Sequence, residues 1–508
     1  MRTMAFTPPD RFNIADYFLD DRIREGRGDR IALRTGAGTL TYNDVSAASN
    51  RFAGLIGRFG CGPGDRVMIA LPDTPHFPAA LFGILKAGCQ VVMVNPHLPP
   101  DQVTRFYGYV EPKLVITTTE GAAAFPAPAG GTRMVVDGDH QSDLEAESDV
   151  FETVETGALD PAIWLFSGGT TGLPKGVVQS HRSFANTTEC YAKGVLDLRE
   201  DDITLSVPKL FFGYATGTNL LFPFSVGASA VLFPERCTAE ELFAQIRRHR
   251  PTILVNVPTM VNHLVSHPLA DVEDLSCLRL ATSAGEALPP ELHHRWNQAF
   301  GVELLDGLGT AEMWHIFLSN RPGTVRPGTL GIPVPGFEIT LVDDEGNEVP
   351  PGEVGRMRVR GGSRAIEYWR RPDLTAEAFQ DDGYVSADMM SRSHDGYFTY
   401  KGRADDMLKV SGKWLSPGEV ENCLLEHAGV KEAAVVGVTT ADGLVKPHAF
   451  VVLAPGAESS DIEARLQDHV KSRLEPYKYP RTVHVRPELP RTHLGKVDRG
   501  ALKRAALE

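Results

Sequence analysis

The stretch WLFSGGTTGLPKGVVQSH, residues 164–181, joins an apolar run to a loop of glycines and hydroxyl residues that a proline and a lysine close. Glycines let backbone amides approach phosphate oxygens, and Thr170 and Thr171 add hydroxyl donors. No glycine-lysine pair followed by Ser or Thr stands at Walker A spacing, which argues against a P-loop NTPase. The stretch therefore predicts a phosphate site of another class, and a plain turn between two strands is the alternative.

Composition narrows the class of protein. A chain of 508 residues predicts about two to four domains or subdomains, and a net charge of −14 argues against a nucleic-acid surface. The six cysteines form no CxxC pair or metal-ligand spacing, so reduced, mostly buried thiols are expected, as in the cytosol. The N-terminus has no signal-like apolar core, and no apolar run reaches about eighteen residues. We expect a soluble, cytoplasmic protein with no membrane partner.

Strand and helix patterns alternate twice along the chain. In the first half, Thr41 and Asp44 form a short capping pattern before a helix that runs to about Gly60. The segments expected to follow are a strand over 67–71, a helix over 75–87, and strands over 91–94 and 114–117. In the second half, Thr238 and Glu241 form a capping box at the start of a helix. A strand over 252–257, a strand-like segment over 278–281, a helix over 292–300 and a strand-like segment over 302–305 are expected to follow. This alternation predicts two doubly wound α/β subdomains with parallel sheets.

Near residue 336 the alternation of strand and helix patterns gives way to strand patterns alone. FEITLV and RMRVR alternate like strands on either side of a turn cluster, which predicts a small β-rich lobe. GRADD at 402–406 is a polar joint, and a compact mixture of helix and strand patterns follows it. We therefore expect a large N-terminal domain over 1–403 and a small, mobile α/β C-terminal domain over 404–508.

Several further polar, glycine-containing loops follow expected strands or join two elements, where ligands gather in open α/β sheets. They are SAGEALP at 283–289, LLDGLGTAEMWH at 304–315, DGYVSAD at 382–388, GRADDMLKVSG at 402–412 and PRTHLGKVDR at 490–499. Their order and content resemble the adenylate-forming superfamily of acyl-CoA synthetases, luciferases and adenylation domains, from LTYNDV at 40–45 to KVDRGAL at 496–502. Within it, PKLFFGYATGTN at 208–219 and DGLGTAEMWHIFLSNRPG at 306–323 are most similar to benzoate-CoA ligases and their aryl-acid relatives.

The resemblance implies an acid-thiol ligase reaction in two steps. A carboxylate attacks the α-phosphorus of ATP to give an acyl-adenylate, and a thiol then displaces AMP to give a thioester. The implied partners are ATP, Mg²⁺, coenzyme A and a small aryl carboxylic acid such as benzoate or an amino- or hydroxybenzoate. Two alternatives stay open: an enzyme that loads the acyl group onto a carrier protein, and a non-catalytic protein that binds aryl-adenylate or AMP.

The resemblance also assigns roles in nucleotide binding. The residues implied to wrap the β- and γ-phosphates are Ser167, Gly168, Gly169, Thr170, Thr171, Gly172 and Lys175. The residues implied to line the adenine and α-phosphate region are Gly285, Glu286, Ala287, Asp306, Gly307, Leu308, Gly309 and Thr310. Glu312 matches the magnesium ligand, because a carboxylate suits that hard cation, and Asp388 with Arg403 matches the ribose pair.

The remaining implied roles concern binding of the aryl acid, the adenylation step and the thioester-forming step. The residues that match the aryl pocket are Lys209, Phe211, Tyr214, Ala284, Gly309 and His315. Lys496 matches the lysine that contacts the carboxylate and the α-phosphate together, as a point charge on a flexible stem can. The residues that match the hinge and the thioester site are Asp405, Ser411, Gly412, Lys413 and Trp414.

The chain departs from the family pattern at three positions. Gly168 replaces a usual serine in the phosphate loop, so backbone amides would have to compensate. Ala311 stands where a threonine commonly contacts the α-phosphate, and Thr310 is the neighbouring hydroxyl. Glu367 stands where glycine is common, and no physical reason for it is evident.

Overall fold

The computed structural model describes residues 6–167, 174–404, 407–410, 413–440, 444–457, 460–491 and 497–506. The chain forms two compact units: Met1–Ile339 with Val359–Val385, and Thr340–Arg358 with Ser386–Glu508. The division falls within the strands of a four-stranded sheet ordered β16-β17-β19-β20. Its strands are β16 (Phe337–Val342), β17 (Val354–Gly361), β19 (Gly383–Arg392) and β20 (Phe398–Arg403). The domain boundary expected at 403/404 stays a prediction.

The first unit contains a seven-stranded sheet ordered β18-β8-β7-β4-β3-β5-β6. Its strands are β18 (Glu367–Tyr368), β8 (Lys175–Ser180), β7 (Pro161–Ser167), β4 (Gln90–Met93), β3 (Arg66–Ala70), β5 (Leu114–Thr117) and β6 (Thr132–Val135). The strands from β7 to β6 pair in parallel, whereas β8 and β18 add in antiparallel fashion. The helices of this half are α1 (Asp21–Arg24), α2 (Tyr42–Arg58), α3 (His76–Lys86), α4 (Pro100–Val110), α5 (Gln141–Ala146) and α6 (His181–Thr187).

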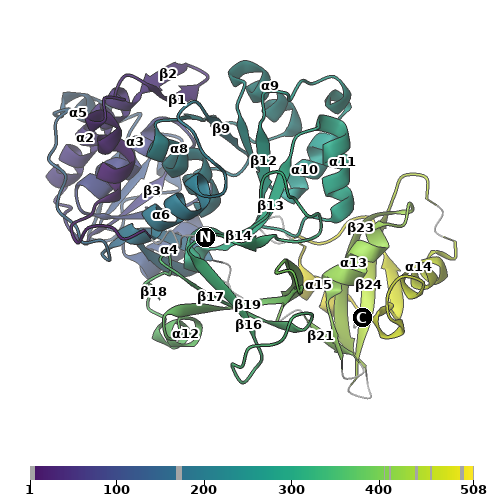
Figure 1. Ribbon diagram of the computed structural model, residues 1–508. Helices are drawn as coiled ribbons and strands as arrows, with labels where there is room; N and C mark the ends of the chain where they lie inside the picture. Colours follow the sequence, from purple (N-terminus) through teal and green to yellow (C-terminus); the bar gives the residue numbers. More distant parts are fainter. Residues whose placement is uncertain are drawn as a thin grey trace. The chain divides into compact units, whose positions relative to one another are not determined.

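A nine-stranded sheet, ordered β15-β14-β13-β12-β11-β9-β10-β1-β2, forms the other half of the first unit (Figure 1). Its strands are β15 (Ile332–Pro333), β14 (His315–Ser319), β13 (Leu304–Thr310), β12 (Leu280–Ser283), β11 (Ile253–Asn256), β9 (Ile203–Ser206), β10 (Ser229–Val231), β1 (Ile31–Thr35) and β2 (Gly38–Thr41). The helices of this half are α7 (Gly213–Thr216), α8 (Phe222–Val226), α9 (Ala239–His249), α10 (Pro258–Val265) and α11 (Pro290–Phe300). Apolar faces of α9, α10 and α11 pack on the central strands through a core that includes Phe243, Leu264 and Trp296.

The second unit contains a three-stranded sheet, ordered β23-β24-β25, and a two-stranded ribbon of β21 and β22. The strands are β21 (Leu408–Val410), β22 (Lys413–Leu415), β23 (Val430–Thr439), β24 (Val445–Leu453) and β25 (Thr482–Val485). The helices of this part are α13 (Pro417–Leu425), α14 (Ile462–Lys471) and α15 (Arg499–Ala505), and α12 (Pro372–Ala378) belongs to the first unit. A separate apolar core, with Val420, Val435 and Leu466, holds α13 and α14 to the sheet.

The two doubly wound halves expected from the alternation are present, but the chain does not divide between them at the glycine-rich loop. The early strands β1 and β2 join the second sheet, because β1 pairs in parallel with β10. The capping box of α2 is formed, since Thr41 and Asp44 bond reciprocally. The cysteines are free thiols, four of them buried. Among the described residues, no helix is long and apolar enough to cross a membrane.

Candidate functional site

Antiparallel pairing of β7 and β8 positions both ends of the glycine-rich loop. Ser167 is the Cα partner of Lys175, so the two residues that flank the loop lie side by side. The Ser167 Oγ is buried and has no hydrogen-bond partner among the described residues. A buried hydroxyl without a partner is costly in the free protein, which marks it as a position where a ligand oxygen can bind. The calls on Gly168, Gly169, Thr170, Thr171 and Gly172 lie outside the described residues.

Tyr368 connects the phosphate loop to the expected magnesium ligand. The Lys175 Nζ lies 4.4 Å from the centre of the Tyr368 ring, and the Tyr368 hydroxyl donates to Glu312 Oε1 at 2.8 Å. Burial and the charge of Glu312 raise the pKa of Tyr368, so this hydroxyl keeps its proton and acts as a donor. Glu312 itself is 5% exposed. Lys175, Tyr368 and Glu312 thus form a continuous polar row within the first unit.

The end of β13 supplies a second hydroxyl without a partner. Thr310 Oγ1 is buried and makes no hydrogen bond within the described part of the chain. Ala311 has no hydroxyl, and its carbonyl oxygen instead accepts a hydrogen bond from Gln179 Nε2 at 2.6 Å. This bond ties β8 to the turn that carries Glu312. Thr310 is therefore available for the phosphate contact that Ala311 cannot make.

The residues expected to line the adenine slot lie directly after β12 and on β13, its parallel neighbour. Ser283 and Asp306 are Cα partners on these strands. Gly285 has a φ of +89°, a conformation that favours glycine, and Glu286 is exposed and accepts from Thr259 at 2.8 Å. The adjacent Ala284 is buried and Ala287 is exposed. Both groups therefore lie at the carboxyl ends of parallel strands, where open α/β sheets bind ligands.

Asp306 is a fully buried acid on β13. Burial raises its pKa well above the ordinary value, and the Gly307 amide opposes the rise. The Asp306 Oδ1 has no hydrogen-bond partner in the described residues. Gly307 and Leu308 pair with β14 beside it, at Ser319 and Leu318. A protonated Asp306 can donate as well as accept, which suits a polar heterocycle better than a charged group.

An aromatic cluster surrounds His315 at the start of β14. The ring centroids of Tyr214 and Phe222 lie 5.2 and 4.6 Å from the His315 ring. Two glycines make room for this histidine. A Cβ on Gly217 would lie 2.4 Å from His315 Cδ2, and one on Gly309 would lie 2.2 Å from the His315 carbonyl oxygen. Two of the other residues predicted for the aryl pocket, Tyr214 and Gly309, therefore lie against His315.

His315 is neutral and fixed in one tautomer. Burial lowers its pKa to about 3. The Ile316 amide donates to Nδ1 at 2.8 Å, so the proton resides on Nε2, which donates to the Tyr214 carbonyl oxygen at 3.0 Å. Both nitrogens are thus engaged within the protein. A hydrogen bond from His315 to a ring substituent would require exchange of the Tyr214 contact.

Lys209 and Phe211 lie on the loop that precedes α7. The Lys209 Nζ donates to the Phe233 carbonyl oxygen at 2.6 Å, and burial lowers its pKa. Both carboxylate oxygens of Asp73 accept from the Leu210 amide, at 3.0 and 3.2 Å. Phe211 packs on Phe212, with ring centroids 4.3 Å apart. A direct substrate contact of Lys209 or Phe211 stays a prediction.

In the second unit, Asp388 and Arg403 are Cα partners on β19 and β20. The Arg403 Nη1 lies 3.9 Å from Asp388 Oδ1, and Ser386 Oγ donates to Asp388 Oδ2 at 2.6 Å. Asp388 is 8% exposed, whereas the Arg403 side chain is about half exposed. The arginine and the serine hold the carboxylate in place, as a ribose-binding aspartate requires.

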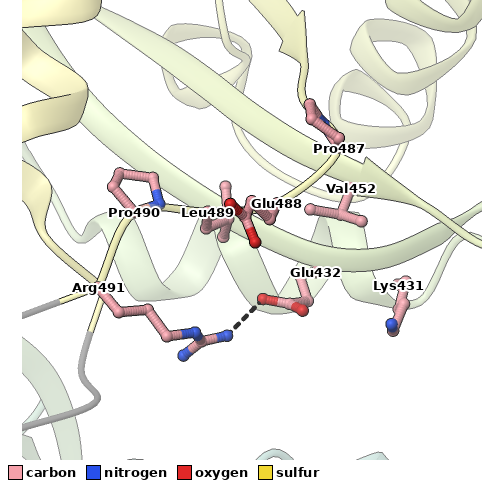
Figure 2. A pocket seen from close by; sticks show the side chains of 8 residues that line it. All are labelled: Lys431, Glu432, Val452, Pro487, Glu488, Leu489, Pro490 and Arg491. Carbon is pink, nitrogen blue, oxygen red and sulfur yellow. Dashed lines mark hydrogen bonds and ion pairs between the residues drawn. The ribbon is translucent and has the colours of Figure 1, made fainter.

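Two described residues, Arg491 and Val497, flank the stretch that contains Lys496. Arg491 and Val497 form an isolated antiparallel bridge, and Arg491 also pairs with Glu432 at 2.6 Å (Figure 2). Figure 2 shows this pair at a pocket of about 550 Å³ between β23, β24 and residues 487–491. Lys496 itself lies outside the described residues.

The expected hinge and thioester residues are described only in part. The calls on Asp405, Ser411 and Gly412 lie outside the described residues. For Lys413 and Trp414 the structure describes the backbone, which pairs on β22 with β21. Their roles stay predictions.

Reasoning from the sequence missed three residues of this region: Tyr368, Gln179 and Asp73. Tyr368 stands next to Glu367 in the EYW segment, where a tyrosine beside a tryptophan was the available signal. Gln179 continues the loop motif, and its burial in a strand calls for a polar partner. Asp73 follows β3 in LPDTP and is indistinguishable from a turn residue without tertiary contacts.

Comparison with known proteins gives full-length matches. Residues 20–369 match the family model of AMP-binding enzymes, and residues 419–496 match its C-terminal domain. The chain is 39% identical to a benzoate–CoA ligase of Thauera aromatica, over 99% of this chain and 97% of the relative. A crystal structure of the anthranilate CoA ligase AuaEII with anthranoyl-AMP superposes with a TM-score of 0.91 at 35% identity, covering 98% of both chains. A benzoate CoA ligase of Burkholderia xenovorans LB400 superposes with a TM-score of 0.89 at 38% identity, covering 97% of this chain and all of that one.

Proposed function

The chain belongs to the family of AMP-binding enzymes, and we propose that it is an ATP-dependent aryl-acid–CoA ligase that releases AMP and pyrophosphate. The aryl carboxylate oxygen forms a bond to the α-phosphorus of ATP while the bond to pyrophosphate breaks. The CoA thiol then loses its proton and attacks the acyl carbon, and AMP leaves. Benzoate and aminobenzoates are the proposed acids, in line with relatives that carry those names.

One observation supports the proposal: a buried hydroxyl, a buried carboxylate and an aromatic cluster lie within six residues at the turn between β13 and β14. Thr310 and His315 are Cα partners across this turn, and Glu312 lies between them. Thr310 offers a hydroxyl with no partner among the described residues, Glu312 a buried carboxylate, and His315 the centre of the aromatic cluster. A flat acid beside Tyr214 and His315 would therefore hold its carboxylate next to the α-phosphate of ATP.

The charged groups of the first unit suit a nucleotide triphosphate with its cation. Glu312 presents a buried carboxylate whose Oε1 already accepts from Tyr368, so its orientation is set before a cation binds. Oxygen ligands of this kind fit Mg²⁺, which Glu312 would hold. When bound, that ion neutralises charge on the phosphates. Ser167 and Lys175, which lie side by side at the opposite end of the row from Glu312, would bind phosphate oxygens.

In the second unit we propose that Asp388 accepts the ribose hydroxyls and that Lys496 contacts the reacting carboxylate. Arg403 and Ser386 restrain Asp388 through its two oxygens. Arg491 and Val497, the described residues on either side of 492–496, pair in an antiparallel bridge. Both reactants are anionic, so the lysine charge acts mainly by neutralisation and positioning.

A substrate panel tests the proposal. Pyrophosphate release and CoA-dependent AMP formation are measured with benzoate, 2-aminobenzoate, hydroxybenzoates and a medium-chain fatty acid. We expect activity with one or more aryl acids, little with the fatty acid, and loss of both signals in Glu312→Gln. A clear preference for the fatty acid overturns the aryl assignment, and no pyrophosphate release with any acid favours a non-catalytic nucleotide binder.

The thiol acceptor needs a separate comparison. CoA and a phosphopantetheinylated carrier protein are supplied in parallel to enzyme that has formed the adenylate. We expect rapid AMP release with CoA. Release with the carrier protein alone would instead favour an enzyme that loads carrier proteins.

A further inference from the structure

Three side chains with metal-ligating atoms meet where α13 ends and α14 passes. Cys423 lies on α13, Glu426 directly follows that helix, and His469 lies on α14. One potential ligand atom from each of the three lies within 4.8 Å of the others. All three belong to the second unit and lie on a part of it that no step of the proposed reaction uses.

The thiol of this cluster is buried without a partner. Cys423 is 4% exposed, and its sulfur makes no hydrogen bond in the described part of the chain. By contrast, the buried Cys89 donates from Sγ to the Gly62 carbonyl oxygen at 3.1 Å. Cys423 therefore presents an unengaged sulfur to the imidazole and the carboxylate.

The neighbouring groups already hold the ligands in position. His469 Nε2 lies 3.0 Å from the Cys423 carbonyl oxygen, a contact that anchors the ring to the end of α13. A hydrogen bond from one ring nitrogen to a backbone carbonyl is the usual support of a metal-binding histidine, because it leaves the other nitrogen unprotonated. Glu426 is exposed, and its Oε2 lies 3.4 Å from Arg473 Nε, a contact that a bound metal ion would share or replace. The ring of His427 lies 5.3 Å from that of His469, so a further imidazole is near.

We propose that Cys423, Glu426 and His469 bind one Zn²⁺ ion and that this ion links α13 to α14. A thiolate, an imidazole and a carboxylate are the donor types that zinc accepts in tetrahedral sites, with water in the fourth position. The same set disfavours Mg²⁺, which takes oxygen ligands only, so this site is chemically distinct from the one at Glu312. Binding releases the thiol proton to solvent and stabilises the folded second unit, since the ligands are together only in the folded chain.

The test uses the full-length protein, stripped of metal by a chelator, and Co²⁺ as a spectroscopic substitute for Zn²⁺. We expect a thiolate-to-cobalt charge-transfer band that saturates at one equivalent and is displaced by Zn²⁺ but not by excess Mg²⁺. Cys423→Ser should abolish the band, and Cys277→Ser, a change at a partly exposed cysteine of the first unit, should leave it intact. Absence of the band in the wild type, or its survival in Cys423→Ser, overturns the proposal.

A second variant keeps the proposal testable if Cys423→Ser fails to fold. His469→Ala changes a partly exposed residue and should weaken Co²⁺ binding by about 10-fold or more. Zn²⁺ should raise the unfolding temperature of the wild type and leave that of His469→Ala nearly unchanged. An equal rise in both proteins contradicts the site.

Discussion

Thr310 and Ala311 differ in a hydroxyl group that can contact a phosphate oxygen, and only Thr310 has it. A buried hydroxyl with no partner costs about 1–3 kcal/mol relative to one that is hydrogen-bonded. Thr310 carries this cost in the free protein, because its Oγ1 is buried and unbonded among the described residues. A phosphate oxygen would relieve it. We therefore expect Thr310 to take the part that the family usually gives to the next position.

Replacing Thr310 by Val tests this role. The change keeps the shape and removes the hydroxyl, so we expect adenylation kcat to fall by about 100-fold, as for loss of one donor to a developing charge. Stability should stay equal or rise, because an unsatisfied group is lost. The measurement is pyrophosphate release at saturating ATP, with Thr310→Ser as the control that keeps the hydroxyl. Unchanged kcat in Thr310→Val would show that Thr310 makes no such contact.

Tyr368 offers a matched test of the magnesium site. Tyr368→Phe removes the hydroxyl that donates to Glu312 and keeps the ring beside Lys175. We expect the Mg²⁺ concentration for half-maximal activity to change by about 3- to 30-fold, since a hydrogen bond to a charged group contributes about 1.5–3 kcal/mol and partial compensation is usual. Tyr107→Phe, whose hydroxyl donates to the Pro126 carbonyl oxygen, serves as the control. An identical Mg²⁺ dependence in both variants contradicts a role for the Tyr368 hydroxyl.

At the level of elements, the aromatic cluster around His315 depends on a glycine in a short helical segment. Gly217 opens the segment Gly217–Leu221 after α7, and the His315 ring occupies the space where its Cβ would be. Trp314 and His315 also have positive φ values, of 32° and 83°, which bulky residues rarely adopt. Backbone strain of this kind persists where packing enforces it, and it gathers at functional sites.

Gly217→Ala should therefore damage the acid pocket before it damages the fold. The new Cβ would lie 2.4 Å from His315 Cδ2, so the ring must move, and such overpacking costs about 1–3 kcal/mol. We expect a raised KM for the aryl acid with a nearly unchanged KM for ATP. Gly57→Ala in α2, where nothing lies within 4 Å of the added atom, should leave both constants unchanged. A parallel rise of both KM values in Gly217→Ala would point to general unfolding.

The loop before α7 is held by a carboxylate whose charge depends on pH. Burial raises the pKa of Asp73 to about 7, while the charge of Lys209 and the Leu210 amide oppose the rise. The unfolded chain has the ordinary, lower pKa, so the folded state binds the proton more tightly. The stabilisation from this proton is fully present below about pH 4 and is lost as the pH rises through about 7.

Asp73→Asn removes that dependence. The free energy of unfolding of the wild type minus that of Asp73→Asn should fall between pH 4 and pH 8, by up to about 4 kcal/mol for the full shift. Urea denaturation at several pH values measures it. A difference that does not vary with pH would mean that Asp73 titrates normally in the folded protein.

At the scale of the whole molecule, the expected mechanism needs two units with separate cores. The second unit has its own apolar core around Val420, Val435 and Leu466, so it can behave as a body of its own. The resemblance implies that the C-terminal domain expected over 404–508 turns after adenylation, which withdraws Lys496 and admits the thiol. A few joint residues that change backbone angles suffice for such a motion.

Asp405→Pro should separate the two half-reactions. Proline fixes φ and removes the amide donor, so a backbone change at this position becomes costly. We expect thioester formation from preformed aryl-adenylate to fall far more than pyrophosphate release in the first step. The two are measured separately, with Ala404→Ser as the control next to the joint. Equal losses in both half-reactions contradict the hinge.

Local patterns in the sequence determined the element types, because capping, periodicity and turn residues act over a few positions. The reciprocal bonds of Thr41 and Asp44 at the start of α2 illustrate this. The motif order also identified the family and the positions to compare. Sheet assignment was different: nothing near β1 signals that it pairs with β10, almost 200 residues away.

The sequence by itself thus determined the fold class, the family and the residue types expected at the candidate site, since short contiguous motifs identify each of them. Only the tertiary structure decided which polar groups are satisfied. It engages both nitrogens of His315, leaves Thr310 Oγ1 without a partner among the described residues, and brings Tyr368 to Glu312. Those outcomes depend on burial and on contacts between distant segments, and a hydrogen bond of that kind has no signature in the local sequence.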